Sequence, residues 1–264
     1  MGVKTPLSLQ TLQTLFPFYN FTSIVATKDG VMDTTYIVSN TKEEYILKRY
    51  ERALTCKVQE DAKRLEKLNS FGLHVPTLLA QKDGWYLYTK LQGEVVRSPS
   101  LPHIIALARF MAVFHNLSRT TKSSSSFLHN YSVKEMLSYT KKNFYMYYKK
   151  LASLHSYTHN NDGFIHGDIF KDNCVFAHHH IGVFDFIDGG NGSFSFDCGV
   201  AVMAFSPKTR LHYYSKVFLQ TYNQHAQKKL TCKELSQEIQ NAKKLYSLLR
   251  IYRYKTTHKI LSKF

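Results

Sequence analysis

Cysteine is scarce in this sequence of 264 residues. The chain has four cysteines, and they lie far apart: Cys56, Cys174, Cys198 and Cys232. They form no C-x-x-C pair and have no histidine partners at the spacing of a zinc site. We therefore expect reduced thiols, with neither a disulfide framework nor a zinc centre.

Long hydrophobic runs are absent as well. The longest apolar stretch, residues 101–117, is interrupted by His103, Arg109 and His115, so it indicates a buried helix rather than a membrane span. The first residues show no unbroken apolar segment followed by a small-residue cleavage site, which argues against a secretion signal. The sequence thus predicts a cytoplasmic protein with no membrane span.

Acidic residues are outnumbered by basic ones. The chain has 35 Lys and Arg against 19 Asp and Glu, a formal net charge of +16, which favours polyanions such as nucleotide phosphates, nucleic acid or anionic lipid. The basic residues are dispersed and form no long arm, so we expect a solvated basic surface and no nucleic-acid partner. Three successive histidines at 178–180 indicate a solvated hairpin tip rather than a metal site. No pattern indicates an oligomeric state.

Residues 1–92 show the alternation and turn signals of a small antiparallel sheet. Ser8 can cap a short helix that runs to about residue 16. Segments rich in β-branched and aromatic residues, typical of strands, follow at residues 21–27, 34–39 and 44–50 and in a hairpin at 78–91. A helix is expected at residues 59–70.

Helical spacing of apolar residues dominates from Gly93 onward. It predicts helices at residues 101–117, 133–156 and 232–264. The sequence therefore predicts an α+β fold with two lobes, residues 1–92 and residues 93–264. The first lobe is a sheet with one main helix, and the second is larger and mainly helical.

The segment GFIHGDIFKDNCVFAHHHIGVFDF, residues 163–186, places acids among apolar residues typical of strands. Strands at 174–176 and 181–184 would form a hairpin, with Asn173 before the first and Asp185 after the second. These two oxygen-bearing side chains would then lie at the same end of the hairpin. Oxygen ligands suit Mg²⁺, which takes one or two protein carboxylates together with nucleotide phosphates. The segment therefore predicts a magnesium site.

His166, Asp168 and Asn173 fit the pattern H-x-D-x-x-x-x-N. Asp168, on the loop before the hairpin, would face a hydroxyl nucleophile and accept its proton during phosphoryl transfer. His166 belongs to the same catalytic set, where we expect it to brace the loop rather than to react. The alternative is that these acids only cap turns, since a single match to this pattern also arises by chance.

A candidate nucleotide-binding lysine lies upstream. Lys48 is on the third strand, where kinase-type phosphotransferases keep the lysine that holds the ATP phosphates. Glu60, at the start of the next helix, could pair with it, and Glu66 is the weaker competitor. The structural alternatives are an exposed strand lysine and a helix-start glutamate favoured by the helix dipole.

The turn GVMDTT, between the first two strands, could cover phosphates. Its candidate contacts are Gly30, Thr34 and Thr35. It is not a G-x-G-x-x-G loop, and the sequence contains no Walker motif.

Six segments together resemble the aminoglycoside phosphotransferase and choline kinase superfamily, whose two-lobed fold is like that of protein kinases: GVMDTTYIV, YILKRYE, FGLHVP, HGDIFKDNCVF, GVFDF and FDCGVAV. They are most similar to the type II homoserine kinases, and the similarity covers nearly the whole chain. The resemblance implies that Asp168 is the catalytic base, that Asn173 and Asp185 bind magnesium, and that Lys48 anchors the ATP phosphates with Glu60 as its partner.

The same resemblance implies two further roles. Asp197, in SFDCGVAV, would support the catalytic loop. The hinge, whose backbone would meet the adenine edge, would comprise Tyr88, Thr89, Lys90 and Leu91.

The implied activity is ATP-dependent phosphorylation of a small alcohol, with L-homoserine converted to O-phospho-L-homoserine for threonine biosynthesis. After Asp185 the chain reads FIDGGNGS, with Asp188 where homoserine kinases more often have aromatic and small apolar residues. Choline, ethanolamine, an aminoglycoside or another amino alcohol therefore stay open as acceptors. A non-catalytic module that binds nucleotides or nucleic acid is the alternative from another class.

Overall fold

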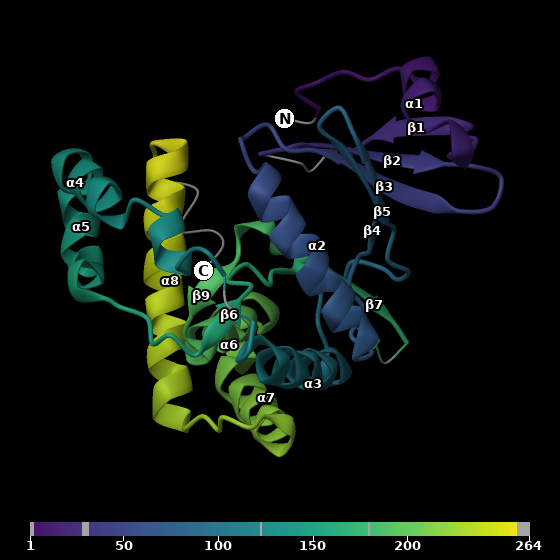
Figure 1. Ribbon diagram of the computed structural model, residues 1–264. Helices are drawn as coiled ribbons and strands as arrows, with labels where there is room; N and C mark the ends of the chain where they lie inside the picture. Colours follow the sequence, from purple (N-terminus) through teal and green to yellow (C-terminus); the bar gives the residue numbers. More distant parts are fainter. Residues whose placement is uncertain (1–2, 28–31, 122, 179, 258–264) are drawn as a thin grey trace. The chain divides into compact units, whose positions relative to one another are not determined.

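A computed structural model describes residues 3–27, 32–121, 123–178 and 180–257 (Figure 1). The chain divides into two compact units, Met1–Gln92 and Gly93–Phe264. The first unit contains an antiparallel sheet and the second is mainly helical, so the predicted α+β class is confirmed. Within the described residues, no helix is both long enough and apolar enough to cross a membrane.

The first unit is built on a five-stranded antiparallel sheet in the order β1-β2-β3-β5-β4. Its strands are β1 Ser23–Ala26, β2 Thr34–Ser39, β3 Glu44–Arg49, β4 Leu78–Lys82 and β5 Trp85–Thr89. Alternate residues of β2 are buried, which is the pattern of a strand with one face on a core. Helix α1, Leu9–Leu15, covers that face and is capped by Ser8 as predicted.

Helix α2, Thr55–Ser70, follows β3 and begins four residues before the predicted start at Gln59. It ends before Gly72, whose positive φ of 81° suits a glycine. Asp61 and Arg64 form a buried ion pair of 2.8 Å on this helix. The earlier start puts Glu60 in the second turn of α2 rather than at its N-terminus.

The second unit contains most of the helices. They are α3 Leu101–Ser118, α4 Val133–Asn143, α5 Tyr145–Leu151, α6 Phe194–Phe205, α7 Leu211–His225 and α8 Cys232–Tyr254. Two short antiparallel pairs join them: β6 Gly163–Ile165 with β9 Gly190–Gly192, and β7 Cys174–Ala177 with β8 His180–Val183. Single turns of 3₁₀ helix complete the two units, at Pro17–Tyr19, Phe127–Asn130, Ala152–Ser156, Lys171–Asn173, Phe186–Asp188 and Lys208–Arg210.

The single helix predicted at residues 133–156 is wrong. The chain leaves the helical conformation at Phe144, with φ −144° and ψ 55°, and so separates α4 from α5. This break lets both short helices pack on α8, where Phe144 joins the cluster of Leu137 and Leu248. Apolar spacing continues across the break because both helices bury a face, and for this reason the sequence pattern does not reveal it. The predicted terminal helix also ends early, at Tyr254; residues 258–264 lie outside the described part.

Helices α6 and α8 pack against each other in the second unit and are visible side by side in Figure 1. A Cβ atom at Gly199 of α6 would lie 2.7 Å from the carbonyl carbon of Glu238 on α8. Glycine therefore permits direct approach of the two backbones. Helix α8 begins with a capping box, in which Thr231 and Glu234 exchange hydrogen bonds.

We expect Gly199→Ala to lower the free energy of unfolding by about 1–3 kcal/mol, because the methyl group must push α8 away. This loss should exceed the gain of about 1 kcal/mol in helix propensity. Urea unfolding measures the change. Ser236→Ala, on the exposed side of α8, is the control and should be neutral or slightly stabilising. An equally neutral Gly199→Ala would contradict the close packing.

Candidate functional site

A buried carboxylate holds the start of the predicted catalytic loop, residues 166–173. Asp197, in the first turn of α6, accepts hydrogen bonds from the backbone N–H groups of His166 at 3.0 Å and Gly167 at 2.7 Å. Nε2 of His115, on α3, lies 3.1 Å from the same carboxylate. Burial acts to raise the pKa of Asp197, but the hydrogen bond and charge of His115 and the hydrogen bond from Gly167 outweigh it and hold the pKa below its ordinary value.

Gly167 lets the loop turn sharply against the core. Its φ is +73°, and a Cβ atom there would lie 1.9 Å from Cε2 of the fully buried Phe127. The hydroxyl group of Tyr246, on α8, donates to the carbonyl oxygen of Gly167. The Tyr246 ring also meets the ring of Phe170 edge-on at 4.9 Å. Tyr246 thus contacts the loop on both sides of Asp168.

Both ring nitrogens of His166 are used to shape the loop. Nε2 donates to the carbonyl oxygen of Phe184 at 2.9 Å, and Nδ1 accepts from the backbone N–H of Asp168 at 3.2 Å. These partners assign the proton to Nε2. The contacts of His166 are therefore those of a positioning residue, and its place in the catalytic set stays a prediction.

Asp168 is held by Asn173. The side-chain Nδ2 of Asn173 donates to the backbone oxygen of Asp168 at 2.8 Å and to its carboxylate at 3.0 Å. Burial raises the pKa of Asp168 to about 6, aided by the charge of Asp185 and opposed by the hydrogen bond from Asn173. A carboxylate with this pKa is mostly ionised at neutral pH, which is the state that can accept a proton.

The two predicted magnesium ligands come from one end of the β7–β8 hairpin. The backbone N–H of Phe184 donates to the oxygen of Asn173 at 3.1 Å, and Asp185 follows immediately. Asp185 is exposed and has the left-handed φ of 70° that Asp tolerates. Because Nδ2 of Asn173 is bound to Asp168, its Oδ1 is the atom suited to a cation. One amide oxygen and one carboxylate fit Mg²⁺.

No group of three or more His, Cys, Asp or Glu suited to a metal occurs among the described residues. An ion held by Asn173 and Asp185 would therefore need phosphate and water oxygens to complete its coordination.

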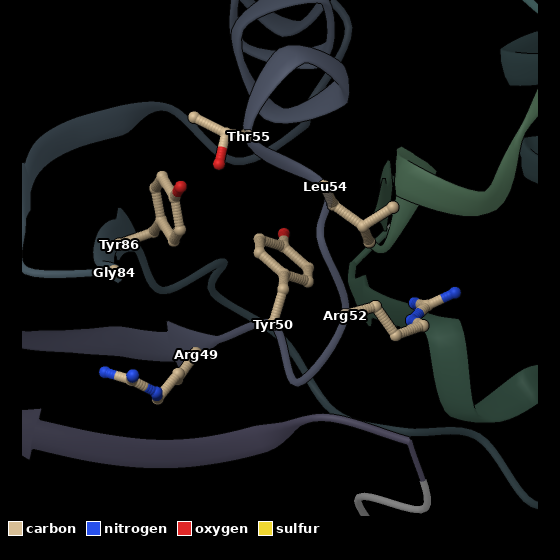
Figure 2. A pocket seen from close by; sticks show the side chains of 7 residues that line it. All are labelled: Arg49, Tyr50, Arg52, Leu54, Thr55, Gly84 and Tyr86. Carbon is tan, nitrogen blue, oxygen red and sulfur yellow. The ribbon is translucent and has the colours of Figure 1, made fainter.

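Lys48 lies on β3, opposite Thr35 on β2 and Tyr86 on β5. Opposed residues of an antiparallel pair point to one face, so these three side chains share the face turned away from the core. A pocket opens where this face meets the start of α2, and Figure 2 shows Tyr50 and Tyr86 on its walls. Its full lining is Arg49, Tyr50, Arg52, Leu54, Thr55, Gly84 and Tyr86.

Thr34 lies on the opposite face of the sheet. Its buried hydroxyl accepts from the backbone N–H groups of Lys4 and Thr5 and donates to Glu51 at 2.6 Å. This arrangement ties the N-terminal segment to the sheet and argues against a phosphate contact, which corrects the prediction for Thr34. Thr35 keeps its place beside Lys48, and Gly30 lies outside the described residues.

The predicted hinge lies at the end of β5 and just beyond it. Tyr88 and Thr89 belong to the strand, and the hydroxyl groups of Tyr88 and Tyr50 are 3.2 Å apart. The Thr89 side chain accepts from the backbone of Thr77, and Lys90 pairs with Glu44 at 2.9 Å. The backbone groups of Leu91 form no hydrogen bond to another of the described residues.

The sequence patterns do not reveal Tyr246, which contacts the loop, or Asp61, which is buried on α2. Asp61 is buried on α2 next to Glu60, whereas Glu66 is exposed. Tyr246 lies 79 residues from Gly167, and no local motif connects them. Its one available signal is an aromatic residue at a core position of a helix, which is equally typical of plain packing.

These features define the class of protein: a sheet unit and a helical unit, with an Asp–Asn loop before a short hairpin, are the parts of kinase-like phosphotransferases. The profile of the phosphotransferase enzyme family matches residues 23–227, and the chain belongs to this family.

Individual relatives are distant. A homoserine kinase of Bartonella tribocorum is 22% identical over 226 residues, which is 76% of this chain and 70% of that protein. An amicoumacin kinase structure aligns with a TM-score of 0.71 and 16% identity, over 96% of this chain and 89% of the other. A microcompartment-associated aminopropanol kinase aligns with a TM-score of 0.67 and 18% identity, over 97% and 93%. The structural likenesses establish the fold.

We expect Tyr246→Phe to lower kcat about fivefold, because it removes one hydrogen bond from the loop while keeping the ring in place. The KM for ATP should stay within twofold. Steady-state kinetics separate the two constants. Tyr252→Phe is the control, since it removes a hydroxyl of α8 that bonds Glu135 away from the loop. Equal kcat values for both variants and the wild type would show that Tyr246 only fills space.

We expect Asp197→Asn to lower the free energy of unfolding at pH 7 by about 3–5 kcal/mol, because it breaks a buried charged network. The pKa of Asp197 is lowered from 3.8 on folding. Its stabilisation is therefore complete above that value and is lost as the pH falls through the folded-state pKa. The difference in free energy of unfolding between the wild type and Asp197→Asn should therefore shrink below about pH 4. Urea unfolding at pH values from 7 to 3 measures this difference. Asp172→Asn, at an exposed position, is the control. A difference that stays constant with pH would contradict the lowered pKa of Asp197.

Proposed function

We propose that the protein transfers the γ-phosphoryl group of ATP to the hydroxyl of a small alcohol, and that this alcohol is L-homoserine. The observation that supports it is the geometry of Asp168, a buried carboxylate positioned by Asn173 and by a loop that Asp197 anchors. Membership of the phosphotransferase enzyme family supports the reaction class.

In this mechanism Asp168 accepts the proton of the acceptor hydroxyl as the oxygen attacks the γ-phosphorus. The new O–P bond forms while the bond to the bridging oxygen breaks, and ADP leaves. Asn173 and Asp185 would hold magnesium, which supplies charge neutralisation at the phosphates. Lys48 would bind the phosphates as a point charge. Catalysis comes from positioning and electrostatic stabilisation rather than from covalent chemistry.

The remaining nucleotide contacts belong to the same proposal. Residues 1–92 would form the nucleotide-binding lobe, and residues 93–264 the catalytic and acceptor-binding lobe. Glu60 would orient Lys48, and Gly30 and Thr35 would cover the phosphates. The backbone at Tyr88, Thr89, Lys90 and Leu91 would meet the adenine edge.

Homoserine as acceptor is supported by the curated relatives, which are homoserine kinases at 22–23% identity. Relatives at this level of identity support the reaction class more strongly than they support homoserine as the acceptor. Amino alcohols, choline and aminoglycosides are therefore tested beside homoserine.

We expect Asp168→Asn to reduce acceptor-dependent ADP release by about 10²–10⁴-fold, because the variant cannot accept the hydroxyl proton. Nucleotide affinity should change little. ADP release is measured with ATP and Mg²⁺ against L-homoserine, choline, ethanolamine, serine, threonine, 3-aminopropanol and kanamycin.

Asp172→Asn is the matched control, since Asp172 is an exposed acid of the same loop, and its activity should stay within threefold of the wild type. Full activity of Asp168→Asn would exclude Asp168 as the base. Turnover of another alcohol with loss in Asp168→Asn would keep the mechanism and replace the acceptor.

A further inference from the structure

Helix α8 places a cation beside the catalytic loop. Tyr246 fixes the position of α8 there, through its bond to Gly167 and its ring contact with Phe170. Arg250 follows four residues later, so it lies on the same face of the helix, about 6 Å further along the axis. The side chain of Arg250 is partly buried.

The groups that act electrostatically on Arg250 include two carboxylates of the same loop. Burial lowers the pKa of Arg250, and four groups oppose that shift: Tyr254, Asp172, Asp168 and Tyr246. Two of them are carboxylates of the catalytic loop. The charge of Arg250 therefore acts on Asp168, the carboxylate that is proposed to accept the proton of the substrate hydroxyl.

A partly buried guanidinium group at this place suits one kind of acceptor. Arginine binds carboxylates through two parallel hydrogen bonds, with a planar geometry that lysine cannot reproduce. It would repel an acceptor whose nearest group is an ammonium or a quaternary amine. In homoserine, four bonds separate the hydroxyl oxygen from the carboxylate carbon, a span of about 5 Å by standard bond lengths.

We infer that Arg250 binds the carboxylate of the acceptor, so that the protein selects hydroxy acids and hydroxy amino acids over alcohols without an acid group. The inference rests on the proposed function, because it assigns the acceptor subsite of the same reaction. It adds a specificity-determining residue on α8, outside every motif of the catalytic segment.

Three acceptors distinguish the contributions of the two charged groups of homoserine to binding. L-homoserine has both, 4-hydroxybutyrate has only the carboxylate, and 3-amino-1-propanol has only the amine. They are tested on the wild type, Arg250→Gln and Arg250→Lys. The matched control is Arg253→Gln, which removes the same charge from an exposed position of the same helix. The readouts are kcat and KM for each acceptor, KM for ATP, and calorimetric binding of 4-hydroxybutyrate.

We expect Arg250→Gln to raise the KM of homoserine and 4-hydroxybutyrate roughly 10- to 100-fold, the loss typical of a charge-assisted hydrogen bond. Arg250→Lys should lie between it and the wild type, because lysine keeps the charge without the bidentate geometry. The KM for 3-amino-1-propanol and for ATP should stay within twofold in every variant. Arg253→Gln should match the wild type throughout.

Several results would overturn the inference. If Arg250→Gln weakened the activity toward all three acceptors alike, Arg250 would have a structural role. If it raised the KM for ATP, Arg250 would act in nucleotide binding. If Arg253→Gln had the same effect, the effect of Arg250→Gln would be explained by the change in net charge alone. Wild-type preference for 3-amino-1-propanol would contradict it outright while leaving the proposed phosphotransfer intact.

The binding measurement separates failure of the inference from failure of the proposed function. If no acceptor is phosphorylated but 4-hydroxybutyrate binds the wild type and not Arg250→Gln, the carboxylate site stands and the reaction is wrong. If neither turnover nor binding occurs, both are wrong.

Discussion

The buried carboxylate of Asp197 is the constraint on which the second unit depends. A charge enclosed in protein is costly unless hydrogen bonds replace its lost water, and here the two backbone N–H groups of His166 and Gly167, together with His115, provide that replacement. These groups come from α3, α6 and the catalytic loop. The fold and the loop therefore stabilise each other, because neither can move without leaving a buried charge unsatisfied.

Around Asp168, polar side chains are used mainly to position neighbours. His166 uses both ring nitrogens on the loop backbone, and Asn173 uses its amide nitrogen on Asp168 itself. Tyr246 adds a clamp from a distant helix. Phosphoryl transfer offers a protein little covalent chemistry to perform, so rigid placement of one carboxylate and one cation is the main requirement. The number of positioning contacts in this loop is consistent with that requirement.

The sequence predicts the parts of this structure that depend on neighbouring residues. The strands of the sheet, the cap at Ser8 and the hairpin that follows Asn173 all arise from local alternation and turn chemistry. The break at Phe144 is invisible because apolar spacing continues across it, and the face occupied by Thr34 depends on strand register that composition does not fix. Contacts of Tyr246 and Arg250 arise only when α8 docks, long after the loop in the chain.

Charge balance explains why a cation on α8 is useful in a protein that is already strongly basic. The dispersed surface charge of +16 is screened beyond about 10 Å at ordinary ionic strength, so it can attract anions in general but cannot orient a small ligand. The catalytic segment itself is acidic, with Asp168, Asp172 and Asp185 close together in the chain. A carboxylate-bearing acceptor would meet repulsion there unless one fixed cation opposed it. Arg250, partly buried and therefore less screened, can oppose it at the distance over which a small substrate extends.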